Sequence, residues 1–124
     1  MKLVIGGLAQ GKLDYVLEKY QLKKEQVWDG VLPEEERETN VVIYNLQHWV
    51  RERVQKEESL DAIWTFVEEH PDVILICNEV GNGVVPMDPM ERAYREQTGR
   101  LLIKLANKAE SVERVVCGIG QKLK

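Results

Sequence analysis

Four short apolar segments predict the strands of one sheet. They are rich in branched residues and lie at residues 3–5, 41–44, 73–77 and 114–117. Their apolar character is almost continuous rather than alternating, which is typical of parallel strands that helices cover on both faces. The chain is therefore expected to contain a buried, mostly parallel sheet.

Helical periodicity occupies the intervals between these segments. Apolar residues recur at i, i+3, i+4 and i+7 over residues 13–20 and 60–67, and a similar pattern at residues 46–54 follows the second predicted strand. The longest predicted helix runs from Pro89 to about Ala109, because an aspartate followed by proline is typical of a helix start. Strands that alternate with helices predict an α/β fold, in which helices flank a mostly parallel sheet in three layers.

Length and charge narrow the class of protein. The 124 residues fit one compact domain spanning residues 1–124. Seventeen basic and 21 acidic residues are interleaved and give a formal net charge of −4, which argues against a nucleic-acid-binding surface. No apolar run approaches the ~20 residues of a membrane-spanning helix, and the first residues lack the apolar region of a signal peptide. We therefore expect a cytoplasmic protein that binds neither nucleic acid nor membrane.

The two cysteines are expected to be reduced core residues. Cys77 and Cys117 lie in apolar, strand-like segments and have no metal-binding spacing. Disulfides are rare in cytosolic proteins, and free cysteine is among the most buried residue types.

The segment after the first predicted strand has the pattern of a phosphate-binding loop. Gly6, Gly11 and Lys12 satisfy Gly-x-x-x-x-Gly-Lys between a strand and a helix. Backbone N–H groups at Gly6, Gly7 and Gly11 could hold a phosphate chain at the positive end of the helix, and Lys12 could reach the terminal phosphates. Leu13 offers no hydroxyl where Ser or Thr would bind magnesium. The alternative is a glycine-rich turn with an exposed lysine.

A second glycine-containing segment, residues 78–86, follows the third predicted strand. Because the carboxyl ends of parallel strands meet at one edge of a sheet, we expect this segment on the same rim as Lys12. Its candidate nucleotide-binding residues are Asn78, Gly81 and Gly83, and its candidate metal-binding and catalytic residue is Glu79. The alternative is a strand-to-helix connection in which Asn78 and Glu79 only hydrogen-bond the loop.

Two arginines near the start of the last predicted helix are further candidates for nucleotide binding. Arg92 and Arg95 are three residues apart, so they share a helix face and could clamp an anionic group. Exposed arginines that pair with Glu91 and Glu96 are the alternative.

From Asn78 to Lys124 the sequence resembles the adenosylcobinamide kinase / adenosylcobinamide-phosphate guanylyltransferase family of cobalamin biosynthesis. The residues that carry the resemblance are Asn78–Pro86, Arg92-Ala93-Tyr94-Arg95-Glu96 with Gly99, and Gly118-Ile119-Gly120-Gln121-Lys122-Leu123-Lys124. The phosphate-loop pattern and Leu46 with Trp49 are also similar to this family. The resemblance implies a P-loop NTPase-like fold, ATP or GTP as the nucleotide, a corrinoid substrate and a homo-oligomer.

The chain departs from the family pattern at residues that bear on activity. Leu13 and Tyr44 stand where family members have Ser or Thr and an acid, so the usual magnesium ligands are absent. Neither His48 nor His70 matches the histidine that accepts the guanylyl group. Guanylyl transfer is therefore disfavoured.

Two functions remain open. The first is a nucleotide-binding protein with kinase activity, in which Lys12 stabilises the transferring phosphoryl group and Glu79 binds magnesium or acts as a base. The alternative is a catalytically degenerate module of the same fold, which binds a nucleotide or anion and serves in regulation or assembly.

Overall fold

The computed structural model describes residues 1–34, 41–80 and 87–124. Within these residues, a six-stranded sheet forms the centre of the protein. The strands are β1 (Lys2–Gly6), β2 (Val27–Asp29), β3 (Val42–Tyr44), β4 (Ile74–Asn78), β5 (Ser111–Val116) and β6 (Ile119–Lys122). Their order across the sheet is β2-β3-β4-β1-β5-β6, and all pairs are parallel except β5–β6. The predicted α/β fold with a mostly parallel sheet is therefore confirmed.

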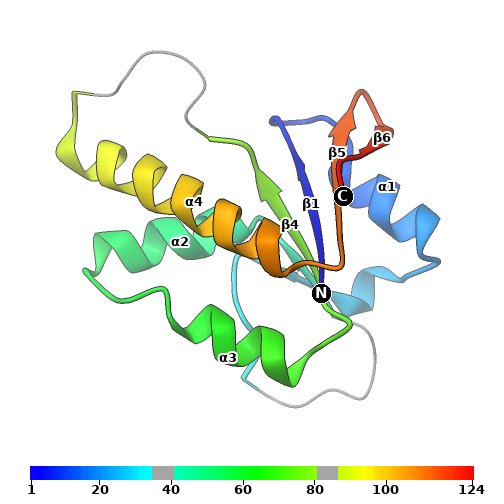
Figure 1. Ribbon diagram of the computed structural model, residues 1–124, viewed down its shortest axis with the longest axis horizontal. Helices are drawn as coiled ribbons and strands as arrows, with labels where there is room; N and C mark the ends of the chain where they lie inside the picture. Colours follow the sequence, from blue (N-terminus) through cyan, green and yellow to red (C-terminus); the bar gives the residue numbers. More distant parts are fainter. Residues whose placement is uncertain (35–40, 81–86) are drawn as a thin grey trace.

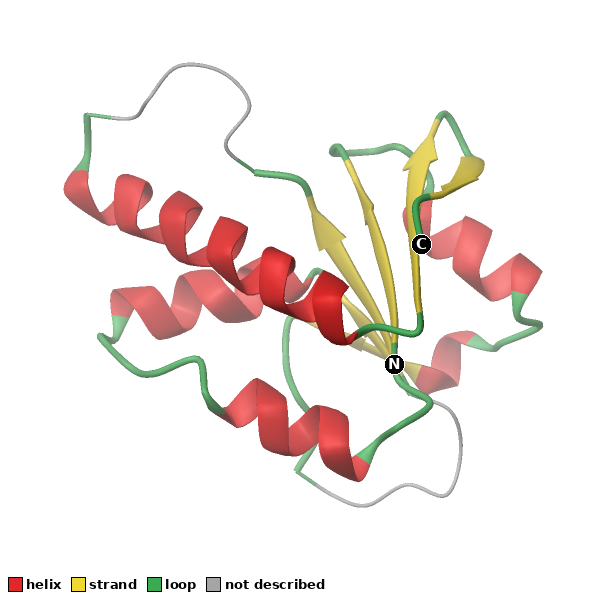
Figure 2. Cartoon of the chain, in the orientation of Figure 1, coloured by secondary structure: helices red, strands yellow, loops and turns green. Residues whose placement is uncertain are grey.

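Helices cover both faces of this sheet (Figure 1). They are α1 (Lys12–Lys19), α2 (Leu46–Gln55), α3 (Ala62–Glu69) and α4 (Pro89–Lys108), with a short 3-10 helix at Lys24–Gln26. Helix α1 lies on one side of the strands, and α2, α3 and α4 lie on the other side (Figures 1 and 2). The predicted three layers are present.

The two faces of the sheet have separate apolar cores. On one face, Val16 of α1 packs with Val4 and other inward-facing strand residues. On the opposite face, Trp49 of α2, Ile63 of α3 and Leu105 of α4 belong to a larger buried cluster. Alternate residues of each buried strand thus face different helices, which explains why the strand segments are apolar throughout.

Helix α4 begins where the sequence predicts. The Asp88 carboxylate accepts a hydrogen bond from the Met90 backbone N–H at 2.8 Å, and Pro89 occupies the first helical position. This cap satisfies one of the free N–H groups of the first turn. In the described ranges, no helix combines the length and the apolar character that crossing a membrane requires.

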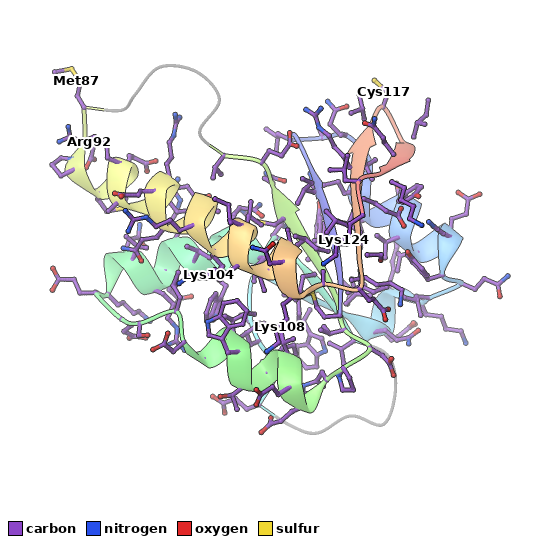
Figure 3. The ribbon with its side chains drawn as sticks, in the orientation of Figure 1. Met87, Arg92, Lys104, Lys108, Cys117 and Lys124 are labelled. Atoms are coloured by element: carbon purple, nitrogen blue, oxygen red, sulfur yellow. The ribbon has the colours of Figure 1, made fainter. Side chains whose placement is uncertain are left out.

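The end of β5 corrects one prediction about the cysteines. Cys77 in β4 is buried, but Cys117 is exposed. The chain reverses after Val116, and Cys117 and Gly118 form the turn of the β5–β6 hairpin with φ angles of 52° and 75°. Figure 3 shows Cys117 at the tip of this hairpin. The expectation of two core cysteines was therefore wrong for Cys117, because the apolar run ends at a turn.

Candidate functional site

The turn between β1 and α1 places Lys12 at the carboxyl end of the central strand. Gly11 precedes the helix with a φ of 82°, a conformation that glycine adopts without strain. Lys12 is only 5% exposed, and its Nζ donates a hydrogen bond to the Gly7 carbonyl oxygen at 2.6 Å. The exposed lysine of the simpler alternative is therefore not observed.

Burial changes the acid–base properties of this lysine. Removal from water lowers the pKa of Lys12 below its ordinary value, and the negative charge of the nearby Glu79 opposes this shift in pKa. Burial also raises the pKa of Cys77 to about 12, so that this thiol stays protonated near neutral pH. Lys12 is thus a cation held at a cost, at the edge of the sheet where ligands of parallel α/β proteins bind.

Gly6, at the end of β1, allows the backbone to pass close to β5 and to the Lys12 side chain. A Cβ atom at Gly6 would lie 2.6 Å from the Val115 carbonyl oxygen and 3.2 Å from Lys12 Cδ. Any larger residue would push β1 away from β5 or displace the lysine. This glycine therefore serves close packing beneath the lysine.

The β5–β6 hairpin supports the turn from the side. The Cys117 backbone N–H donates to Gln10 Oε1 at 2.7 Å, and the Gly118 N–H donates to the Gln10 carbonyl oxygen at 2.8 Å. Gln10 is thus a supporting residue that the sequence reasoning missed. Its only signal was its place within the glycine pattern, because its partners lie more than 100 residues away in the chain.

The segment after β4 lies beside the same turn. Asn78 is paired in register with Gly6, and the Glu79 backbone N–H donates to the Gly6 carbonyl oxygen at 2.8 Å. The structure therefore brings together Lys12, Asn78 and Glu79 with the glycines Gly6, Gly7 and Gly11. Gly81 and Gly83, the other two candidates of this segment, lie outside the described residues.

Glu79 has a partner that the sequence did not indicate. Arg114 of β5 contacts it through two bonds, Nε to Oε1 at 2.9 Å and Nη2 to Oε2 at 3.1 Å. Both carboxylate oxygens are therefore engaged by a guanidinium group. Within residues 1–34, 41–80 and 87–124, no cluster of three or more His, Cys, Asp or Glu residues could hold a metal ion.

A row of polar side chains continues along the carboxyl ends of the neighbouring strands. The Asn78 N–H donates to Gln47 Oε1 at 3.0 Å, Gln47 Nε2 donates to Asn45 Oδ1 at 3.1 Å, and Asn45 Nδ2 donates to Asp29 Oδ1 at 2.8 Å. Gln47 is buried within the first turn of α2, and the sequence reasoning did not single it out. It fixes the end of β4, from which Asn78 and Glu79 extend.

The two arginines of α4 are placed differently from the turn residues. Arg92 is exposed at the end of α4 that is remote from the β1–α1 turn (Figure 3), and Arg95 lies half-buried one turn further along. Glu91 forms an ion pair with Arg51 of α2, and Glu96 pairs with Arg100 at 2.5 Å. The structure therefore does not bring Arg92 into the group around Lys12.

The geometry defines an α/β protein with a buried lysine in a glycine-rich turn at the carboxyl edge of a parallel sheet. Residues 21–123 match a family model described as cobinamide kinase / cobinamide phosphate guanyltransferase, and the chain belongs to this family. The matched range begins after the turn that carries Lys12, so the assignment of that turn depends on its sequence pattern and geometry.

Curated relatives agree with the family assignment. The chain is 46% identical over 52 residues to the bifunctional adenosylcobalamin biosynthesis protein CobU of Salmonella typhimurium, and equally to that of Escherichia coli strain K12. Each match covers 42% of this chain and 29% of the relative. The chain thus matches less than a third of the length of these proteins.

Proposed function

We propose that this protein binds ATP or GTP through the turn from Gly6 to Lys12. The observation that carries the proposal is the buried Lys12 ammonium, which lies at the start of α1 and is held by the Gly7 carbonyl oxygen at 2.6 Å. A buried cation is costly unless an anion or a hydrogen-bond acceptor compensates it. Phosphate oxygens could supply both kinds of compensation.

The start of α1 supports phosphate binding. No side chain caps the first turn of this helix in the described structure, so its backbone N–H groups are available to a ligand. Such groups, together with the positive end of the helix dipole, favour an anion. Lys12 would exchange its bond with the Gly7 carbonyl for one with a terminal phosphate.

The family description supports kinase activity as the reaction of this site. In that reaction an alcohol oxygen of the acceptor attacks the γ-phosphorus and its proton passes to solvent water, the bond to the β-phosphate bridging oxygen breaks, and the nucleoside diphosphate leaves. Lys12 and the N–H groups of the turn would stabilise negative charge on the phosphoryl oxygens. The family description alone supplies the acceptor, a cobinamide-type corrinoid.

The residues of this site do not fit a magnesium ion. Leu13 has no ligand atom, and Glu79 already uses both carboxylate oxygens on Arg114. Magnesium prefers several oxygen ligands in an octahedral arrangement. We therefore assign no step of the reaction to a magnesium ion held by these residues.

A nucleotide- or anion-binding module without transfer activity is the second candidate. It is favoured by Leu13 and by the engaged Glu79 carboxylate. In this case the same turn binds the nucleotide, and the module acts in regulation or assembly. For both candidates we propose a cytoplasmic protein that forms homo-oligomers. Its ligand would be a nucleotide rather than nucleic acid or a membrane.

Calorimetric titration with ATP, GTP and pyrophosphate tests nucleotide binding. We expect Lys12→Ala to weaken binding of all three by about 100-fold, because a charge-assisted hydrogen bond in a buried site is lost. Lys104→Ala is the matched control, since this lysine is exposed on α4 (Figure 3), and it should bind like the wild type. Unchanged affinity in Lys12→Ala would contradict the proposal.

An assay for phosphorylated cobinamide separates the two candidates. Product that depends on both ATP and Lys12 supports the kinase. Lys12-dependent nucleotide binding without product supports the module.

A further inference from the structure

We propose that Arg114 binds the nucleotide phosphates and supplies the positive charge that a magnesium ion supplies in other phosphate-loop sites. Glu79 holds the Arg114 guanidinium in place until the nucleotide arrives. The inference rests on the proposed nucleotide-binding function and adds a residue that lies outside the motifs that carry the family resemblance.

The position of the Arg114–Glu79 pair is the first argument. Arg114 lies on β5 and is paired in register with Ile5 of β1, whereas Glu79 follows β4 on the other side of β1. The Glu79 N–H also donates to the Gly6 carbonyl oxygen at 2.8 Å. The ion pair therefore crosses the carboxyl end of β1, where the turn to Lys12 begins.

The balance of charge is the second argument. Lys12 and Arg114 both interact with Glu79, one electrostatically and the other through two hydrogen bonds. Two cations thus share one carboxylate, which leaves one positive charge in excess beside the turn. A phosphate chain carries several negative charges and would use both cations.

The chemistry of the guanidinium group is the third argument. Its planar fork binds phosphate in the same bidentate geometry as carboxylate, so a phosphate can replace Glu79 without loss of hydrogen bonds. The Arg114 side chain is 45% exposed, whereas the Glu79 side chain is 19% exposed. The arginine is thus the partner with room to turn toward a ligand.

The missing ligand at Leu13 is the fourth argument. An ordinary phosphate loop places a hydroxyl there for magnesium, and this chain has an isobutyl group. Even when a phosphate has replaced Glu79 on Arg114, this one carboxylate does not complete a magnesium site, so the guanidinium supplies a permanent positive charge in place of a dissociable ion. Binding of the phosphates should then be nearly independent of magnesium.

Calorimetric titration of ATP in EDTA and in excess magnesium tests the inference with Lys12→Ala, Arg114→Gln, Arg114→Lys and the wild type. For the wild type, the Kd of ATP should differ by less than about twofold between the two conditions. In EDTA, Arg114→Gln should weaken binding by about tenfold, because a charged phosphate contact is lost. The Kd of Arg114→Lys for ATP should lie between the values of the wild type and Arg114→Gln, because lysine keeps the positive charge but lacks the bidentate guanidinium group. Arg100→Gln on α4 is the matched control and should bind like the wild type.

Glu79→Gln distinguishes a phosphate contact from a structural ion pair. It removes the competing carboxylate and keeps the guanidinium, so ATP should bind about threefold more tightly in EDTA. If Glu79→Gln binds ATP more weakly than the wild type, the pair only maintains the fold and the inference is overturned. This variant also decides the matter if Arg114→Gln does not fold.

The remaining outcomes separate this inference from the proposed function. Binding that needs Lys12 but is unaffected by Arg114→Gln overturns the inference alone. Wild-type binding that weakens by more than about tenfold in EDTA also overturns it. If Lys12→Ala leaves the Kd of ATP unchanged, both the proposed function and this inference are overturned.

Discussion

Lys12 carries a buried charge that costs stability and that the proposed nucleotide binding would use. Its side chain is 5% exposed, and burial lowers its pKa, so the folded protein bears a cost for keeping the ammonium charged. The Gly7 carbonyl oxygen offsets part of this cost through a 2.6 Å hydrogen bond. An apolar core residue of similar length would avoid the cost, which makes the lysine informative about function.

We therefore predict that Lys12→Met separates binding from stability. The thioether chain has a similar volume and needs no hydrogen bond, so the free energy of unfolding should be unchanged or about 1 kcal/mol higher. Urea denaturation measures this quantity, and calorimetry should show the loss of ATP binding. A loss of stability greater than about 2 kcal/mol would mean that Lys12 serves the fold instead.

The buried Glu113 carboxylate on β5 forms hydrogen bonds that connect this strand to α1. Glu113 accepts hydrogen bonds from Tyr15, from Lys19 at 2.5 Å and from Tyr20 at 2.9 Å. Burial alone would raise the pKa of Glu113, but the bonds from Lys19, Tyr15 and Tyr20 outweigh it and hold this pKa below its ordinary value. The cluster fixes the helix whose first residue is Lys12.

We predict that Glu113→Gln destabilises the protein in a pH-dependent way. At pH 7 the free energy of unfolding should fall by about 2–3 kcal/mol, because a buried, hydrogen-bonded charge is lost. Since the pKa of Glu113 is lowered in the folded state, the wild type should lose this contribution as the pH falls below the ordinary value of 4.5. The free energy of unfolding of Glu113→Gln should not show this decrease at low pH.

Urea denaturation between pH 3 and pH 7 measures the effect of Glu113→Gln. Glu110→Gln is the control, since Glu110 forms an exposed ion pair with Lys2, and it should change stability less. Equal pH profiles for the wild type and Glu113→Gln would contradict the prediction.

The strands differ in how well the sequence could predict them. The strands β1, β3 and β4 are apolar because helices cover them, and their continuous apolar runs are enough to find them. Only the end of β5 was predicted, because Ser111 and Glu113 interrupt its apolar character. The strands β2 and β6 were missed, because these short edge strands carry no continuous apolar run. The turn at Cys117 was missed for a related reason, since apolar character alone does not mark where a strand reverses.

Strand order across the sheet decides which distant residues of the molecule meet. The glycine pattern predicted the turn at Lys12, since all of its residues are adjacent in the chain. The pairing of Glu79 with Arg114 could not be predicted, because it depends on β4 and β5 flanking β1. The same holds for Gln10 and Cys117, which a hairpin at the end of the chain brings together. A site assembled from distant strands requires the topology as well as the motifs.

We propose that phosphates bind at the turn between β1 and α1. Titration of ¹⁵N-labelled protein with ATP, followed by the amide NMR signals, tests it most directly. We expect the largest shifts at the amides of Gly7, Gly11 and Lys12, whereas amides of α3 such as Ile63 should remain unchanged. If the largest shifts occurred at another surface and the three turn amides were unaffected, the proposed phosphate site would be wrong.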